Sequence, residues 1–105
     1  MEIGTDKGKK MTITKKLTED KIEIVGEYKN IQIRTATVIE EDGIELTRTF
    51  HRRTLECVFS VQDGDTWNHT DTDVSGESAD VQGIASAVWT DLVKEAKKTA
   101  NERGE

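Results

Sequence analysis

The strongest pattern in the sequence is an apolar stripe near its C-terminus. Its members recur at the spacing of one helical face, and they are Val81, Ile84, Ala85, Val88, Trp89, Leu92, Val93 and Ala96. Ser75 or Ser78 can cap the start of such a helix, and Gly104 marks a stop. A stripe this wide is typical of a helix laid on the apolar face of a sheet, rather than of a narrow coiled-coil seam. We therefore predict one long C-terminal helix that packs on a sheet.

A second pattern, with a period of two residues, runs through residues 12–59 and predicts half-buried strands. Asp42-Gly43 is a favoured type I′ pair and predicts a two-residue hairpin loop, and Lys29-Asn30 predicts another. The chain is therefore expected to be α+β, with an antiparallel β-meander of about four strands followed by the helix. The sheet residues expected under the helix are Ile22, Ile24, Ile33, Ile39 and Leu46.

Charge and glycine content suggest how the chain is organised. Residues 1–10, "MEIGTDKGKK", predict a flexible basic arm, and residues 11–105 predict a single α+β domain. Residues 62–74 are rich in aspartate and predict a polar loop. Residues 55–61 either extend the fourth strand or form a short fifth one. Translation can start at Met1 or at Met11.

Composition narrows the classes of protein to consider. Of the 105 residues, 33% are hydrophobic and 34% charged, a lean core that favours a homo-oligomer or a larger partner. The net charge of −6 argues against a protein that coats duplex DNA or an anionic membrane. No apolar run approaches the roughly 20 residues that span a bilayer. Cys57 is the only cysteine, which excludes an internal disulfide and favours a reducing, intracellular location.

Basic residues cluster around the stretch "TFHRRT", residues 49–54. Strand alternation and the predicted Asp42-Gly43 loop assign Arg48, Phe50 and Arg52 to one face, and Arg34, His51 and Arg53 to the other. The second set is the candidate partner-binding site, because guanidinium groups offer paired donors to phosphates and carboxylates. A solvated sheet face explains this set equally well. Arg48 is expected to find a structural partner such as a carboxylate.

Catalytic and metal-binding patterns are weak. The sequence contains no Gly-rich phosphate loop, no paired-cysteine motif and no nucleophile elbow. "DTDVSGESADVQ" imitates a calcium loop, but Gln82 occupies the position where a bidentate Glu closes the shell. His69 has no second His or Cys at metal-ligand spacing. We expect no catalytic residues, no metal site and no cofactor, and a protein that is not an enzyme.

Two segments, "KIEIVGEYKNIQIRTATVIEEDGIELTRTFHRR" and "SGESADVQGIASAVWT", carry a resemblance to known sequences. The chain resembles small uncharacterised proteins of tailed bacteriophages, particularly phages of marine and cyanobacterial hosts. It departs from them by inserting "LECVFSVQDGDTWNHTDTD" where a shorter link is typical. The resemblance implies a small virion or assembly component, present in the host cytoplasm during assembly or in the virion, and it transfers no functional residues.

Two functions are compatible with these observations. The first is a phage structural or assembly protein that makes subunit contacts with copies of itself or with a larger phage protein. The alternative is a small binding module that engages nucleic acid or a host protein through Arg34, His51, Arg53 and the lysines of the arm.

Overall fold

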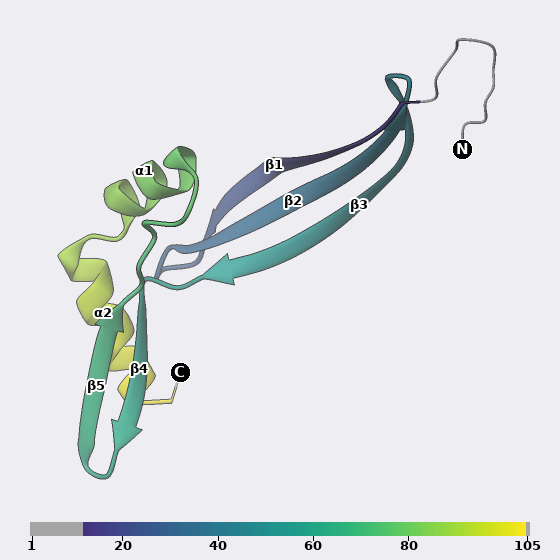
Figure 1. Cartoon of the computed structure of the whole chain (residues 1–105). Coiled ribbons are helices and arrows are strands. Elements are labelled where there is room, and N and C mark those ends of the chain that lie inside the picture. The colour runs from purple at the N-terminus through teal and green to yellow at the C-terminus, as the bar shows by residue number, and fades with distance from the viewer. Residues whose placement is uncertain (1–11, 105) are drawn as a thin grey trace, which may run out of the picture. The chain divides into compact units, whose positions relative to one another are not determined.

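The structure is a computed structural model that describes residues 12–104. In chain order its elements are β1 (Ile13–Val25), β2 (Asn30–Glu41), β3 (Ile44–Leu55), β4 (Val58–Asp63), β5 (Thr66–Asp71), α1 (Ala79–Val88) and α2 (Asp91–Glu102). One sheet has the order β1-β2-β3 and a second pairs β4 with β5 (Figure 1). The α+β class is confirmed. The predicted four-stranded meander with one long helix is wrong, and the predicted arm, residues 1–10, lies outside the described residues.

Of the two hairpin turns predicted for the first sheet, one is confirmed and the other is wrong. Asp42 and Gly43 have φ values of 52° and 84°, so both adopt the positive φ that a type I′ turn requires, and this prediction is confirmed. The Lys29-Asn30 loop is wrong, because the turn covers residues 26–29 and Lys29 N donates to the Gly26 carbonyl at 3.2 Å. Gly26, at φ 83°, takes the left-handed conformation most easily and allows the earlier turn. Tyr28 consequently lies in the turn instead of a strand.

The second sheet occupies a segment expected to be irregular. Residues 66–71, inside the predicted Asp-rich loop, form β5 and pair antiparallel with β4, with Ser60 opposite His69 and Phe59 opposite Thr70. The strands are joined by Gly64 and Asp65, and Gly64 has φ 64°. A two-residue Gly-Asp loop is a recognised hairpin connection, so this strand pair had a local signal.

The predicted single helix is interrupted at Trp89. This residue has φ −90° and ψ 69°, outside the helical region, and ends α1. Thr90 then caps α2, because its side chain accepts a hydrogen bond from Val93 N at 3.2 Å. The break shifts the phase of the apolar stripe, and Leu92 becomes 81% exposed. No helix within residues 12–104 is long and apolar enough to cross a membrane.

The described chain divides into two compact units. The first contains the residues up to Lys21 together with Arg34–Arg52, and its described part consists of strand segments and the turn between β2 and β3. The second contains Ile22–Ile33 and the residues from Arg53 onward, including β4, β5 and both helices. Each unit is described separately below.

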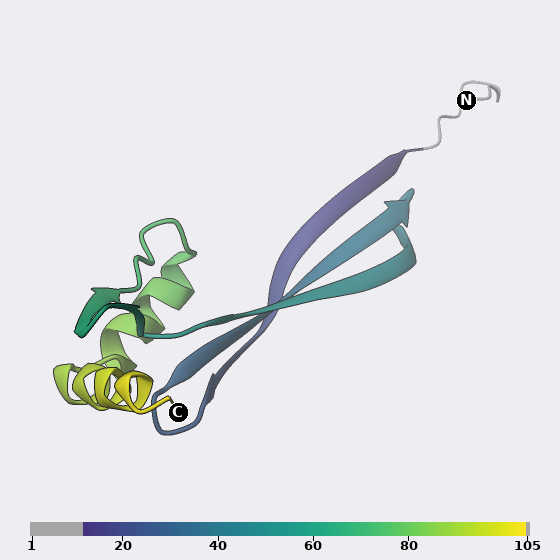
Figure 2. The ribbon, with the colours of Figure 1, turned by 90° about the horizontal axis from the view of Figure 1, so that it is seen from below.

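The second unit holds the main hydrophobic core. Its buried members are Ile31, Ile33, Cys57, Val58, Val81, Ala85 and Trp89. Helix α2 packs against β4 and β5 and lies on one side of this hairpin (Figure 2). The Trp89 indole fills the core and donates from Nε1 to the Lys29 carbonyl at 2.7 Å. This hydrogen bond therefore links the junction between α1 and α2 to the turn between β1 and β2.

The predicted core is confirmed in its centre and wrong at its edges. Val81, Trp89 and Ile33 are buried, and a further group is partly buried against them, Ile22, Ile84 and Val88. Three predicted members are exposed instead, Ile24, Leu46 and Leu92. Leu46 belongs to the first unit, whose described residues include no helix.

Candidate functional site

The most unusual surface belongs to the part of the first unit formed by residues 13–21 of β1, 34–41 of β2 and 44–52 of β3, which we call the first-unit sheet. Its large apolar side chains are between 43% and 69% exposed, and they are Ile13, Leu17, Ile44, Leu46 and Phe50. Ala36 and Val38 are the buried hydrophobic residues of this sheet. A sheet normally buries one face against a second layer, whereas the described residues of the first unit form no second layer on this sheet.

Arg34, a predicted site residue, lies in the centre of a polar cluster on this sheet. Its Nε donates to Asp20 Oδ1 at 3.0 Å and its Nη2 to Oδ2 at 2.8 Å, a bidentate pair. The guanidinium carbon lies 4.3 Å from the Phe50 ring centroid, and that of Arg52 lies 5.8 Å from it. The hydrogen bonds from Arg34 lower the pKa of the Asp20 carboxyl. The predicted separation of Arg34 from Phe50 onto opposite faces is therefore wrong.

Arg48 forms a second bidentate pair in the same unit. Its Nε and Nη2 donate to the two carboxylate oxygens of Glu45 at 3.1 and 2.9 Å. The prediction that Arg48 has a structural partner is therefore confirmed. These hydrogen bonds lower the pKa of Glu45 and raise that of Arg48. Lys16 also pairs with Glu40 at 3.2 Å. Much of the charge on the first-unit sheet is thus already neutralised within the chain.

The other two predicted partner-binding residues differ from Arg34 in their surroundings. Arg53 belongs to the second unit, where Nη1 and Nη2 donate to the Glu77 carboxylate at 2.9 and 2.6 Å. His51 is exposed on β3 in the first unit. The structure therefore divides Arg34, His51 and Arg53 between two units and gives both arginines acidic partners.

The Arg53–Glu77 pair gives a pH-dependent prediction. Hydrogen bonds from Arg53 lower the pKa of Glu77 from its usual 4.5, so the pair stabilises the fold above that pH, and the stabilisation is lost as pH falls through the lowered value. We expect Glu77→Gln to be less stable than the wild type at pH 7, and this difference to close in acid. Urea unfolding at several pH values measures it.

Glu95→Gln is the matched control, because Glu95 forms an exposed ion pair with Lys98 on α2. A difference between wild type and Glu77→Gln that stays constant down to pH 2 would contradict the assignment.

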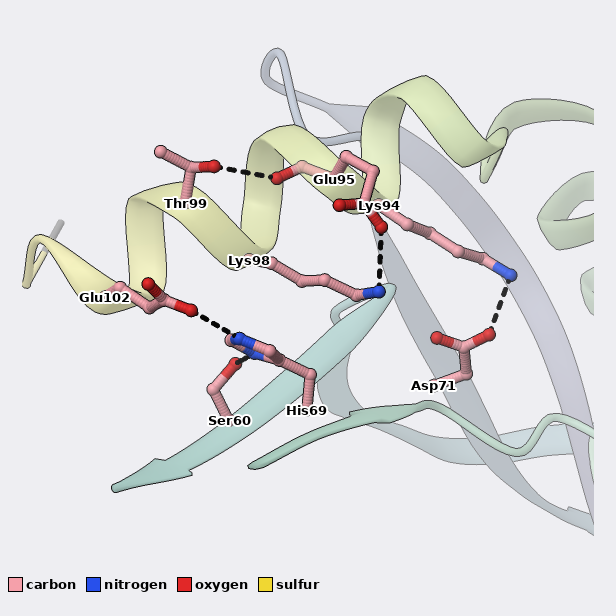
Figure 3. A network of polar contacts seen from close by, with 8 residues as sticks. All are labelled: Ser60, His69, Asp71, Lys94, Glu95, Lys98, Thr99 and Glu102. Carbon is pink, nitrogen blue, oxygen red and sulfur yellow. Dashed lines mark hydrogen bonds and ion pairs between the residues drawn. The ribbon is translucent and has the colours of Figure 1, made fainter. Parts of the chain in front are cut away.

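The second unit contains a polar network between α2 and the β4–β5 hairpin (Figure 3). Lys94 Nζ donates to Asp71 Oδ2 at 3.0 Å, and Lys98 Nζ donates to Glu95 on the same helix at 2.8 Å. Lys97 is buried, with Nζ 3.5 Å from Glu56 Oε1. The Lys94–Asp71 pair joins α2 to β5, a strand in the segment that the sequence predicted as a loop.

His69 links three elements of this network. Asn101 Nδ2 donates to Ser60 Oγ at 2.9 Å, and Ser60 Oγ lies 2.6 Å from His69 Nδ1. His69 Nε2 lies 2.6 Å from Glu102 Oε2. A ring that accepts at Nδ1 and donates at Nε2 satisfies every contact. Serine, histidine and carboxylate are also the residue types of a catalytic triad. Here, however, the Ser60 hydroxyl accepts a hydrogen bond from Asn101 of α2. We therefore interpret this chain of hydrogen bonds as one that holds the helix to the hairpin.

The sequence reasoning missed this network, since it treated His69 as a loop residue. A usable signal was the Gly64-Asp65 pair, because a two-residue loop there places Ser60 opposite His69. The C-terminal helix then supplies Asn101 and Glu102 from consecutive positions.

The remaining candidate chemistry is limited. Asp73 Oδ1 accepts from Ser75 N at 2.9 Å, and this backbone hydrogen bond lowers the Asp73 pKa, as in a turn that leads into a helix. Burial raises the pKa of the Cys57 thiol, in keeping with a small core residue. Within the part of the chain that the structure describes, no group of three or more His, Cys, Asp or Glu residues could hold a metal ion.

Comparison of the chain with protein-family models, curated proteins and solved structures finds no match.

Proposed function

We propose that this protein is a non-enzymatic assembly component, and that copies of it associate through the first-unit sheet. The observation that carries the proposal is that this sheet exposes more large apolar side chains than it buries. Five large apolar side chains are substantially exposed there, while Ala36 and Val38 supply its buried hydrophobic residues. Large apolar side chains left exposed on one sheet of a folded protein are typical of a surface that contacts another protein.

The resemblance to small proteins of tailed bacteriophages extends this proposal to a role in building a phage particle. On that basis the protein acts in the host cytoplasm during assembly, or as a part of the virion. Such a role requires repeated contacts with copies of itself or with a larger phage protein, and it requires no reaction chemistry.

The alternative function, a small module that binds nucleic acid or a host protein through Arg34, His51 and Arg53, has less support. Arg34 and Arg53 hold bidentate carboxylates, so a phosphate has to displace Asp20 and Glu77 before either arginine can bind it. The net charge of −6 also opposes a polyanion. Nucleic-acid binding that falls steeply with salt would favour the alternative.

Leu46→Asp tests the proposal. Leu46 is exposed, so its replacement leaves the monomer folded but puts a charge into the proposed contact. We expect the concentration for half-association to rise at least about tenfold, as for a central apolar contact residue. Sedimentation velocity over a concentration series measures this value, and circular dichroism checks the fold.

Phe59→Asp is the matched control, because Phe59 is 53% exposed on β4 in the second unit. Association that is weakened equally by both variants would show general adhesion of apolar surface. A wild-type protein that is monomeric at every concentration would reject the proposed function.

A further inference from the structure

Helix α2 buries little apolar surface. Of its 12 residues only Lys97 and Ala100 are buried, while Val93 is partly buried and Leu92 is 81% exposed. By contrast, α1 and its C-terminal cap supply three buried core residues, Val81, Ala85 and Trp89. Because the free energy of packing grows with the apolar area that is buried, apolar packing holds α2 to the second unit more weakly than it holds α1.

Polar contacts supply the rest of the attachment of α2 to the β4–β5 hairpin and to the bend before it. They are the pairs Lys94–Asp71, Lys97–Glu56, Asn101–Ser60 and Glu102–His69, at 3.0, 3.5, 2.9 and 2.6 Å. Ion pairs at a protein surface each contribute little to stability, and dissolved salt screens them. The strength with which α2 is held therefore depends on ionic strength.

The junction between the two helices allows α2 to move as one body. Trp89 leaves the helical conformation, and its indole is buried in the core. Thr90 caps α2 separately, because its side chain accepts a hydrogen bond from Val93 N at 3.2 Å. When the contacts with the hairpin open, α2 keeps this cap and remains an intact helix.

We infer that α2 is a strap held in place mainly by charge, which opens with residues 89–90 as its hinge while the rest of the second unit stays folded. A local opening of this kind costs less free energy than global unfolding, because few apolar contacts are lost. The strap and the segments that it contacts all belong to the second unit. A failure of the proposed association through the first-unit sheet therefore leaves the strap unaffected.

Cys57 can report the opening, because it is the only cysteine of the chain and is buried. It follows Glu56, the partner of Lys97, and precedes β4, against which α2 packs. Burial raises the pKa of the Cys57 thiol, and the positive charges of Lys97 and Lys94 act against this shift. Cys57 therefore lies next to α2, and release of the strap gives a reagent access to its sulfur.

Alkylation of Cys57 by iodoacetamide, a neutral reagent, tests the strap in the wild-type chain. Raising the salt concentration from about 0.05 M to about 0.5 M should speed alkylation about threefold, because the ion pairs of α2 are screened. The alkylation rate should also depend on urea less steeply than global unfolding does, since a local opening exposes less surface. A rate that ignores salt, a urea dependence equal to that of global unfolding, or no alkylation of the folded protein would overturn the inference.

Substitutions at α2 test whether its contacts with the hairpin hold it closed. Lys94→Gln removes the ion pair with Asp71 and should speed alkylation about two- to fivefold. Glu95→Gln is the matched control and should leave the rate unchanged, because its ion pair with Lys98 lies within α2. Equal rates in the two variants would contradict the strap, and circular dichroism checks that each variant is folded.

Glu102→Ala tests whether α2 opens as one body. It removes the contact with His69 at the C-terminal end of the helix, far along the chain from the hinge. We expect it to speed alkylation about two- to fivefold, and the double variant with Lys94→Gln to show the product of the two single effects. An unchanged rate in Glu102→Ala would show that only the last turn frays, and would overturn the one-body opening.

Discussion

Replacing Trp89 by alanine should lower the free energy of unfolding by about 3–5 kcal/mol, the largest effect of any single substitution considered for this chain. The indole is buried in the second-unit core, and its loss leaves a cavity among side chains that include Ile33 and Val81. The substitution also removes the hydrogen bond from Trp89 Nε1 to the Lys29 carbonyl, so a part-buried acceptor loses its partner. Chemical denaturation followed by circular dichroism measures the change.

Leu92→Ala is the control for this prediction. Leu92 belongs to the same apolar stripe of the sequence but is 81% exposed, so its replacement should change stability by no more than about 0.5 kcal/mol. Equal losses in the two variants would contradict the break at Trp89, because a continuous helix would bury both residues on one face.

These two residues show how far periodicity predicts this fold. The spacing from Val81 to Trp89 correctly identified the buried helical face, because it follows from the geometry of one helix. The spacing beyond Trp89 misled, since Thr90 starts a new helix with a different orientation. Thr90-Asp91 before an apolar residue is a helix-start signal, and the continuous stripe concealed it.

The two hairpin turns of the first sheet also show what the local sequence can and cannot predict. Asp42-Gly43 was predictable because two positive φ values in succession strongly select this dipeptide. Gly26 was read as a strand residue, although it is the position in that hairpin with the least resistance to a left-handed conformation. The early turn moved Tyr28 out of its predicted strand.

The candidate site could be predicted least. Alternation identified apolar residues such as Leu46 and Phe50, but it carries no information on whether a second layer covers them. Likewise, the sequence could identify Arg34 and Arg53 as cations, whereas their carboxylate partners lie 14 and 24 positions away. Partners at that separation are chosen by the fold as a whole and leave no local signal.

Association through the first-unit sheet should also slow amide exchange in its two outer strands by a large factor. When a neighbouring copy covers this sheet, the amides of the sheet exchange with solvent only after the contact opens, so a concentration near 100 times the dissociation constant slows exchange about a hundredfold. We expect this protection in peptides that cover residues 13–21 and 44–52. Peptides from β4 and β5 should exchange at the same rate at all concentrations, because this hairpin lies outside the proposed contact.

Hydrogen–deuterium exchange read by mass spectrometry, on the wild-type chain at a low and a high concentration, therefore tests the central claim most directly. The account predicts that exchange slows with concentration in both outer strands of the first-unit sheet while residues 58–71 stay unchanged. Identical exchange in residues 13–21 and 44–52 at the two concentrations would contradict it.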